Sequence, residues 1–272
     1  MTVETLAILM PGDMGHGCAI AFRENGFRVV TNLSGRSDRT KGLAAKAQIE
    51  DLRSFEEVTR QADLVLSILP PENAIDQGRI FADAMIAAGS TPPFVDCNAI
   101  APSTTEKVGA EIARAGALYI DGGIIGNNPV AEKGGTRLYV SGPDTSAVQE
   151  LDGKGMVIRN IGEEIGRASG MKMVYASSTK GTFSLHSAVL TTAHTMGLTE
   201  EYLEELRQSQ PAMLTAMERM IPRIPLDAAR WLDEMHEISA TFADAGVTPK
   251  FHQGAADMMA LADRTPISAE TR

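Results

Sequence analysis

The sequence contains only two cysteines, and no hydrophobic run approaches the roughly 20 residues that a membrane-spanning helix needs. Cys18 and Cys97 both fall in segments that we expect to be buried, which predicts two free thiols in a reducing compartment rather than a disulfide. The chain has no cluster of cysteine and histidine with metal-ligand spacing, so we expect no metal. The N-terminus lacks a basic segment followed by an apolar stretch, which predicts no secretion signal and a cytoplasmic location.

Positive charge is scarce relative to negative charge. The sequence has 25 lysines and arginines against 35 aspartates and glutamates, which gives a formal net charge of -10. This balance argues against nucleic acid as a partner, and the short apolar runs argue against a membrane. With 272 residues, 43% of them hydrophobic, the chain has the composition of a soluble globular protein with one large or two moderate domains. We therefore expect a small molecule as its partner.

The first thirty residues carry a clear structural signal. Residues 6–10 form a short uncharged apolar run, as expected of a strand buried on both faces. A glycine-rich turn follows, then a helical pattern that ends at Gly26, and residues 28–32 have the pattern of a second strand. A strand, a glycine turn, a helix and a strand within about thirty residues predict a dinucleotide-binding βαβ unit.

The glycine turn predicts how a pyrophosphate would be held. Gly12 has no side chain to keep the backbone away from the phosphates, and Gly15 lets the helix pack closely on the strand. The helix N-terminus adds free N–H groups and the positive end of its dipole, so we expect Gly12, Met14 and Gly15 to contact the pyrophosphate. Met10 stands where the usual G-x-G-x-x-G pattern has its first glycine, and the alternative is an ordinary tight turn.

The loop after the second strand predicts the choice of cofactor. An NAD site usually has an acidic residue near the end of this strand, but residues 31–34 contain none. Arg36 and Arg39 lie nearby, together with the hydroxyl groups of Ser34 and Ser37. Cations and hydroxyls suit a 2′-phosphate, so we expect NADP (NADPH) rather than NAD, with Ser34 and Arg36 as ligands. The alternative is a solvated basic loop.

Strands and helices alternate as far as about residue 162, and then the strand signals stop. This alternation predicts an α/β fold, with a Rossmann-type doubly wound sheet in residues 1–164 and an all-helical domain in residues 165–272. The glycine-rich residues 122–129 are predicted to form a loop, and a side-chain cap is predicted for a helix over residues 101–115. The other expected elements include strands over residues 64–69, 94–98, 118–121, 138–142 and 156–161 and helices over residues 43–49 and 74–88.

Five stretches carry a family resemblance: residues 12–15, 63–70, 96–102, 121–126 and 170–174. In this order they resemble the G-x-M-G turn, the strand leading to the nicotinamide end, the Asp-x-Ser-x-x-x-Pro segment, the substrate loop and the catalytic lysine helix of the β-hydroxyacid dehydrogenase superfamily, which includes 6-phosphogluconate dehydrogenase. The resemblance covers nearly the whole chain. Residues 172–181 are most similar to an uncharacterised branch with its own helical C-terminal domain.

The resemblance implies an NADP-dependent oxidoreductase that moves a hydride between the nicotinamide and a small hydroxy or oxo compound, such as a hydroxy acid. Lys172 matches the lysine that acts as general acid or base. Leu69 and Pro70 would lie along the adenosine-to-nicotinamide span, and Asn98 would contact the cofactor or the substrate, unless it caps its own loop. The family also implies a substrate cleft between the domains and a homodimer through the helical domain.

The substrate loop departs from the family pattern. The family carries Ser-Gly-Gly there, whose serine and backbone N–H groups hold a substrate carboxylate, and here the serine position falls on Ile125. We expect Gly123, Ile125 and Asn127 to line the substrate, with a plain turn as the alternative for Asn127. An apolar residue in place of serine favours a second hypothesis, an imine or ketone reductase with an apolar substrate. A non-catalytic NADP-binding protein is the third.

The helix with the lysine also departs from the pattern. The family has an asparagine four residues after the lysine, where it orients a substrate hydroxyl, and here that position is Ala176. Lys180 follows at the next position of the same helix face, and Thr179 borders it. We expect Thr179 or Lys180 to bind the substrate in place of the asparagine. Exposure of Lys180 to solvent is the alternative.

Overall fold

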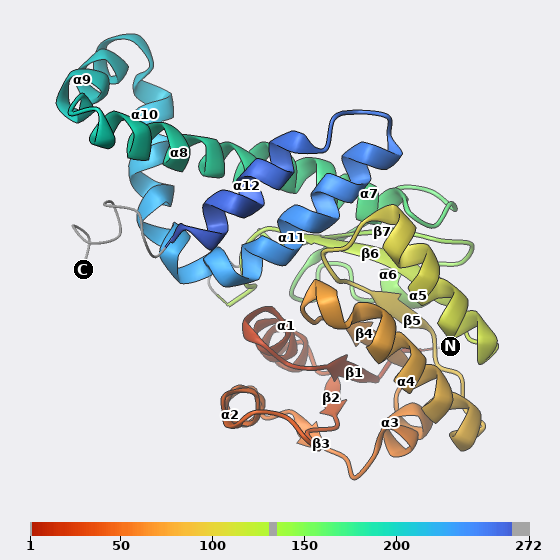
Figure 1. Ribbon diagram of the computed structural model, residues 1–272. Coiled ribbons are helices and arrows are strands. Elements are labelled where there is room, and N and C mark those ends of the chain that lie inside the picture. The colour runs from red at the N-terminus through yellow and green to blue at the C-terminus, as the bar shows by residue number, and fades with distance from the viewer. Residues whose placement is uncertain (1, 131–134, 263–272) are drawn as a thin grey trace. The chain divides into compact units, whose positions relative to one another are not determined.

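The computed structural model describes residues 2–130 and 135–262, and the chain divides into two compact units, Met1–Met173 and Val174–Arg272 (Figure 1). The first unit alternates strands and helices, and the described part of the second unit is helical. The expected order of an α/β region followed by an all-helical region is confirmed.

A sheet forms the centre of the first unit, and the residues described there give it eight strands in the order β3-β2-β1-β4-β5-β6-β7-β8. β1 to β6 run parallel to one another, whereas β7 is antiparallel to β6. The expected Rossmann-type, mainly parallel sheet is therefore confirmed. The strands are β1 Thr5–Leu9, β2 Arg28–Thr31, β3 Glu50–Asp51, β4 Leu64–Ser67, β5 Phe94–Asp96, β6 Tyr119–Ile125, β7 Arg137–Ser141 and β8 Val157–Asn160.

Both faces of this sheet are buried, which explains why its first strand is apolar throughout. Leu6 and Ile8 belong to one hydrophobic cluster, and the neighbouring Ala7 and Leu9 belong to another. Successive residues of a strand point to opposite faces, so β1 contributes to a core on each side. The helices of this unit are α1 Asp13–Glu24, α2 Asp38–Lys46, α3 Phe55–Gln61, α4 Ala74–Ala88, α5 Pro102–Arg114, α6 Ser146–Gln149 and the start of α7 Arg167–Ala176, with a 3-10 turn at Pro71–Asn73.

The prediction that residues 122–129 form a loop is wrong in its first half, because β6 continues through both glycines to Ile125. A Cβ on Gly122 would lie 2.7 Å from the backbone oxygen of Asp96, and a Cβ on Gly123 would lie 2.8 Å from that of Ala168. Glycine at these positions allows neighbouring backbone to come close, which is one of its regular uses inside a strand. The turn begins only at Gly126, where φ is +117°.

Smaller differences lie at the ends of elements. The helix expected from residue 43 begins at Asp38, because the Ser37 hydroxyl caps it by accepting a hydrogen bond from the Thr40 backbone N (3.2 Å). The side-chain cap expected for the helix over residues 101–115 is wrong. α5 follows Ala101, which has no polar side chain, and starts on Pro102, a residue that suits the first helical position. The strand β3 has only two residues, both exposed and acidic, which is too short to show a strand pattern in the sequence.

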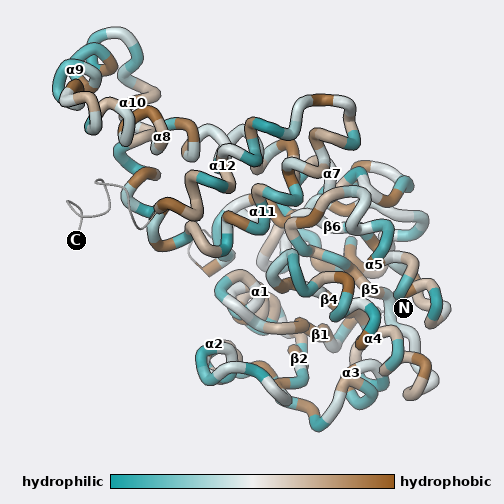
Figure 2. Tube along the Cα trace, in the orientation of Figure 1, coloured by the Kyte–Doolittle hydropathy of each residue, from teal (hydrophilic) through white to brown (hydrophobic). Residues whose placement is uncertain are grey.

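The second unit contains α8 Thr182–Thr195, α9 Thr199–Ser209, α10 Pro211–Met220, α11 Ile224–Asp244 and α12 Lys250–Ala260 among its described residues, with a 3-10 turn at Ile221–Arg223. A π-helical turn, Ser177–Gly181, joins α7 to α8. α11 buries Trp231, Met235 and Ile238 at helical spacing and packs against α12. Figure 2 shows apolar and polar residues alternating along these helices. Among the helices described here, none combines the length and apolar character needed to cross a membrane.

Candidate active site

The glycine turn after β1 has an unusual backbone at its first residue. Met10 adopts a left-handed conformation with φ of 52°, and its backbone oxygen accepts a hydrogen bond from the Gly12 backbone N (2.7 Å). Glycine adopts this conformation without penalty, whereas other residues lose roughly 1 kcal/mol or more. The structure thus explains why the usual pattern has a glycine where this chain has Met10.

The other two glycines of the turn have different surroundings. A Cβ on Gly15 would lie 3.3 Å from Cγ2 of Ile8, which confirms that this glycine lets α1 pack closely on β1. A Cβ on Gly12 would meet nothing nearer than the Met10 backbone oxygen at 4.0 Å. Gly12 is also the N-cap of α1, and no side chain caps this helix. The turn therefore presents an open face and first-turn N–H groups, Met14 among them, that fit a pyrophosphate.

A loop far along the chain is anchored on this turn. The Asn128 side chain donates a hydrogen bond from Nδ2 to the Asp13 backbone oxygen (2.6 Å), and its Oδ1 accepts one from the Val130 backbone N (2.9 Å). A Cβ on Gly17 would fall 1.9 Å from Oδ1 of Asn128, so a glycine inside α1 makes room for this side chain. Residues 126–130, which follow β6 and include the predicted substrate residue Asn127, are therefore held beside the phosphate turn.

Arg36 reaches a residue that the sequence did not single out. Its Nη2 donates a hydrogen bond to Oε1 of Gln77, a buried residue of α4, at 3.0 Å. Nε of Arg36 and Nε2 of Gln77 are both buried and have no hydrogen-bond partner in the described structure. Burial also lowers the pKa of Arg36 from its usual value. Buried donors of this kind indicate a place for an acceptor-rich group such as a phosphate.

The other polar groups predicted near the end of β2 lie on the surface: Ser34 and Ser37 in the loop, and Arg39 at the start of α2. Arg39 donates two hydrogen bonds to the Asp13 carboxylate, at 2.8 Å and 2.7 Å, and both side chains are exposed. This pair neutralises the carboxylate next to the phosphate turn and occupies Arg39. Ser34 is exposed shortly after the end of β2. Gln77 belongs to a different element from this loop, and a single glutamine within a helix gives too weak a local signal to be identified in advance.

The ends of β4 and β5 are tied together by Asn98. Its Oδ1 accepts a hydrogen bond from the Leu69 backbone N (2.7 Å), and its Nδ2 donates one to Oγ of Ser67 (3.1 Å). Asn98 is buried, as is Leu69, whereas Pro70 is exposed. The structure therefore brings the three predicted residues Leu69, Pro70 and Asn98 together at the carboxyl edge of the sheet. The hydrogen bonds give Asn98 a role in holding the loop after β4.

Lys172 lies in α7 against the end of β6. Its Nζ donates a hydrogen bond to the Ile124 backbone oxygen (2.9 Å), and the side chain is half-buried. A Cβ on Gly123 would lie 2.9 Å from Cβ of Lys172, so the glycine is what allows strand and helix to meet at this point. Ile125, at the family's serine position, is buried. The structure thus places the predicted lysine beside the predicted substrate strand.

The predicted substrate residues of the second unit lie in its π-helical turn. The Thr179 hydroxyl is within 3.2 Å of the backbone oxygens of both Tyr175 and Ala176, to which it can donate. Lys180 forms an ion pair with Glu234, and the two side chains are 16% and 4% exposed. The Lys180 ammonium also lies 5.7 Å from the ring centre of Trp231. Lys180 is therefore not a solvated surface lysine.

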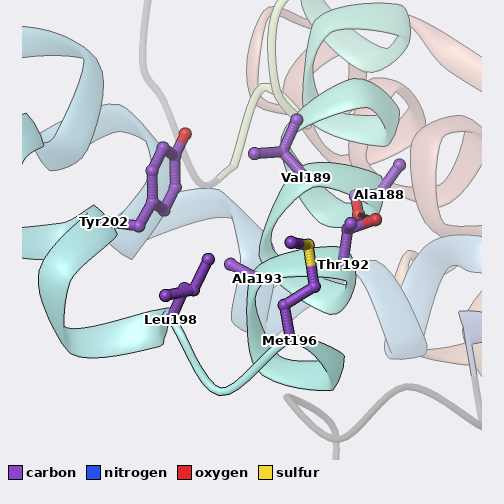
Figure 3. Close-up of a pocket in the computed structure, with 7 residues that line it drawn as sticks. All are labelled: Ala188, Val189, Thr192, Ala193, Met196, Leu198 and Tyr202. Atoms are coloured by element: carbon purple, nitrogen blue, oxygen red, sulfur yellow. Dashed lines mark hydrogen bonds between the residues drawn. The ribbon is translucent and has the colours of Figure 1, made fainter.

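The second unit also has an apolar pocket, which Figure 3 shows in close-up. Side chains of α8, of the connection between α8 and α9, and of α9 line it, including Val189, Met196 and Leu198. Its polar groups are the hydroxyls of Thr192 and Tyr202, and Thr192 already donates to the Ala188 backbone oxygen (2.9 Å). No predicted cofactor or substrate residue lines this pocket, and its chemistry does not suit a dinucleotide.

A mainly parallel sheet, a glycine turn with uncapped helix N–H groups, and the buried donors of Arg36 and Gln77 together define the class of dinucleotide-binding Rossmann-type proteins. Residues 6–166 match the family described as the NAD binding domain of 6-phosphogluconate dehydrogenase, and residues 193–261 match a domain of unknown function, DUF1932. The chain belongs to the 6-phosphogluconate dehydrogenase NAD-binding family. It thus has an NAD(P)-binding domain within a β-hydroxyacid dehydrogenase-like fold.

Three similar proteins show how far this assignment reaches. An uncharacterised 28.5 kDa protein of Methanothermus fervidus is 26% identical over 189 residues, 70% of this chain and 71% of that protein. The solved structure of MTH1747, a conserved protein of unknown function described as structurally similar to 3-hydroxyacid dehydrogenases, is 28% identical, with a TM-score of 0.69 over 96% of this chain and 98% of that chain. The Mycobacterium tuberculosis 3-hydroxyisobutyrate dehydrogenase with L-serine shares the fold at 20% identity, with a TM-score of 0.73 over 100% and 98% of the chains.

Proposed function

We propose that this protein is an NADP-dependent oxidoreductase that transfers a hydride between the nicotinamide and a small hydroxy or oxo compound, in the first instance a hydroxy acid. The observation that carries the proposal is the position of Lys172, whose Nζ lies 2.9 Å from the Ile124 backbone oxygen at the strand with the family's substrate loop. The family assignment and the open phosphate turn support the cofactor half of the proposal.

Residues of the first unit would hold the cofactor. Gly12 would let the pyrophosphate come close to the backbone, and the first-turn N–H groups of Met14 and Gly15 would bind it. Ser34 and Arg36 would bind the 2′-phosphate. Leu69, Pro70 and Asn98 would lie along the path to the nicotinamide. The bound nicotinamide supplies or accepts the hydride, so the protein has only to place the substrate and move one proton.

Lys172 would move that proton. As an amine it accepts the hydroxyl proton when an alcohol is oxidised, and as an ammonium it donates a proton to the carbonyl oxygen in reduction. The hydrogen bond that Lys172 donates to the Ile124 backbone oxygen would hold the side chain in place between turnovers. Gly123, Ile125 and Asn127 would line the substrate on the same strand and loop. Thr179 is the favoured substrate residue of the second unit, because Lys180 would first have to leave Glu234.

The test of catalysis combines turnover with cofactor binding. Purified protein is assayed with NADP⁺ and a panel of hydroxy acids, and with NADPH and the corresponding oxo acids, alongside the variants Lys172→Ala and Lys172→Met. We expect turnover to fall by roughly 10²-fold or more in both variants, while the NADP dissociation constant from titration calorimetry stays within about twofold. Unchanged rates would remove Lys172 from the reaction, and NADP binding without turnover of any substrate would favour the non-catalytic hypothesis.

The cofactor preference has its own test. The wild type should bind NADP more tightly than NAD, and both Arg36→Ala and Gln77→Ala should weaken NADP binding by roughly tenfold while leaving NAD binding unchanged. Arg39→Ala is the matched control, since Arg39 pairs with Asp13 on the surface and should affect both cofactors alike. A wild type that prefers NAD would end the NADP proposal.

One observation favours a second candidate function. Ile125 is buried where the family has a serine, so this position of the strand offers no hydroxyl for a carboxylate and suits an apolar substrate. An imine or ketone reductase would meet that description. Turnover of cyclic imines or apolar ketones with NADPH, in the absence of turnover of any hydroxy acid, would replace the first candidate by this one.

A further inference from the structure

Two carboxylates lie side by side inside the first unit. Asp96 at the end of β5 and Asp121 in β6 are register partners in neighbouring parallel strands, and they are 1% and 0% exposed. Buried carboxylates are costly unless hydrogen bonds satisfy them, so each must be held by the groups around it. The role proposed above for Lys172 uses neither of them.

Asp121 holds the first turn of the helix that carries Lys172. Its Oδ2 accepts hydrogen bonds from the backbone N of Gly166 (2.9 Å), Ala168 (2.9 Å) and Ser169 (3.0 Å). Its Oδ1 accepts one from the hydroxyl of Ser169. Lys172 follows Ser169 by about one helical turn. Asp121 is thus an acceptor for the N-terminal N–H groups of α7, which have no partner within the helix itself.

Two hydroxyl groups join Asp121 to Asp96. Oη of Tyr119 donates to Oδ2 of Asp96 at 3.1 Å, and Oη of Tyr119 lies 2.6 Å from Oγ1 of Thr105. Oγ1 of Thr105 in turn lies 3.3 Å from Oδ1 of Asp121. The four groups form one hydrogen-bonded chain in the buried interior, with a carboxylate at each end.

Each hydroxyl in this chain has a single proton to donate. When Asp96 is ionised, the two hydroxyls have two protons for three contacts. Tyr119 then donates to Asp96, and the 2.6 Å contact of Thr105 with Tyr119 is favoured over its 3.3 Å contact with Asp121, so Asp121 loses the Thr105 donor. When Asp96 carries a proton, it can donate to Tyr119, which donates to Thr105, which donates to Asp121. The protonation state of Asp96 therefore decides whether the Thr105 proton points to Tyr119 or to Asp121.

We propose that this row of four hydrogen-bonded groups is a proton-controlled positioning device. A proton bound at Asp96 turns both hydroxyls toward Asp121, and this tightens the hold of Asp121 on the α7 turn that leads to Lys172. Asp121, Thr105 and Tyr119 are positioning residues, because they act on Lys172 only through the first turn of α7. One proton from solvent binds Asp96, two hydroxyls rotate, and no other bond changes. The consequence for turnover rests on the proposed function of Lys172, but the structural coupling does not.

The surroundings of Asp96 place this change near neutral pH. Burial raises the pKa of Asp96 to about 7, and the neighbouring Asp121 charge acts in the same direction. Its other titratable neighbours are Tyr119 from β6 and Cys97 next in the chain, and burial raises the pKa of both well above the usual range, so they stay neutral. Above neutral pH an ionised Asp96 would both withdraw the Thr105 proton and place a second negative charge beside Asp121.

Amide hydrogen exchange of the full-length protein tests the coupling without any assay of activity. We expect the protection of the Ala168 and Ser169 amides, corrected for the intrinsic exchange rate, to fall as pH rises from 6 to 8 by roughly fivefold more than that of the reference amides in α4, which corresponds to the loss of one hydrogen bond. The amides of Phe81 and Ala82 in α4 report global stability over the same range. We call this pH-dependent loss of α7 protection the step. It should persist in Thr105→Ser and vanish in Thr105→Val. It should also vanish in Tyr119→Phe, a variant that keeps the ring stacked on Phe94.

Thr59→Val is the matched control, because Thr59 is also a buried threonine. Its hydroxyl donates to the Glu56 backbone oxygen and takes no part in the hydrogen bonds between Asp96 and Asp121. Its step should equal that of the wild type. The coupling would be overturned by an equal step in Thr105→Val, or by a wild type in which the α7 amides change no more than those of α4. A step in a protein that turns over no substrate would leave the coupling in place and refute the proposed function, and turnover without a step would do the reverse.

Discussion

Met10 shows that one residue can carry a conformational cost at a site where glycine is usual. Its φ of 52° is left-handed, and its side chain packs partly against the second hydrophobic cluster. Replacement by glycine removes the backbone cost and the apolar contact together, whereas replacement by alanine removes only the contact. We therefore expect Met10→Gly to be more stable than Met10→Ala by roughly 1 kcal/mol in urea or guanidinium unfolding.

The control for this prediction is the same pair of substitutions at an ordinary helical position. Lys107 is exposed inside α5, where alanine should be more stable than glycine by about 1 kcal/mol. A reversal of the glycine–alanine order between the two positions would identify the left-handed backbone as the cause. The same order at both positions would show that Met10 has no such cost.

Asp96 should make stability depend on pH. An aspartate in an unfolded chain titrates near ~3.9, whereas burial raises the pKa of Asp96 to about 7 in the folded chain. Between these values the folded chain keeps a proton that the unfolded chain has lost, so the free energy of unfolding falls as pH rises through this window and levels off above it. Asp96→Asn lacks this contribution, and its stability relative to wild type should increase by roughly 2 kcal/mol from pH 5 to pH 7.5.

Urea unfolding at several pH values measures this difference. Asp38→Asn, at an exposed position in the first turn of α2, is the control and should differ from wild type by the same amount at every pH. Parallel stability curves for the wild type and Asp96→Asn would contradict the raised pKa.

At the scale of elements, the junction of β6 and α7 depends on Gly123. A Cβ there would lie 2.8 Å from the Ala168 backbone oxygen and 2.9 Å from Cβ of Lys172, so one of the two elements must shift. We expect Gly123→Ala to lower the free energy of unfolding by roughly 1–3 kcal/mol and to reduce turnover more than cofactor affinity, because the shift displaces Lys172. Unfolding curves and a comparison of kcat with the NADP dissociation constant measure the two effects.

Gly42 provides the matched substitution. It lies in α2, and a Cβ there would meet nothing within 4 Å, so Gly42→Ala should be neutral or stabilising by up to about 1 kcal/mol. Equal effects at the two positions would mean that β6 and α7 are not in close contact at Gly123.

The elements that the sequence predicted well are those with a local signal. The apolar run of β1, the glycine that ends α1 and the helical spacing over α4 each depend on residues close together in the chain. β6 could not be recognised in full, because glycine usually marks a turn and only the three-dimensional neighbours of Gly122 and Gly123 explain its use in a strand.

In the candidate site, too, the residues with a local sequence signal were predicted and their distant partners were not. The phosphate turn, Arg36 and Lys172 follow from motifs and resemblance, and the structure gives each a position that fits. Gln77 accepts a hydrogen bond from Arg36, which lies 41 positions before it in the sequence. Asp121 accepts one from Ser169, which lies 48 positions after it. Polar contacts of that separation leave no periodic trace in a sequence, since each partner has an unremarkable local context.

At the scale of the whole molecule, the apolar surface of the second unit bears on assembly. Leu185 and Met196 are 62% and 65% exposed on α8 and just after it, and Met196 and Leu198 line the pocket of Figure 3. The family resemblance implies pairing of helical domains, and a second copy of this chain would remove these side chains from water. We therefore propose a homodimer through this face, with a mass in solution twice the 29.0 kDa of the chain.

Leu185→Glu and Met196→Glu should each convert the dimer into a folded monomer, because a carboxylate on a symmetric apolar interface is buried twice without a partner. Sedimentation velocity gives the mass, and circular dichroism checks that the variants remain folded. Ile86→Glu is the control, since Ile86 is an exposed apolar residue of α4 in the first unit and its replacement should leave the dimer intact. A monomeric wild type would refute the dimer, and a dimer that resists both substitutions would place its interface elsewhere.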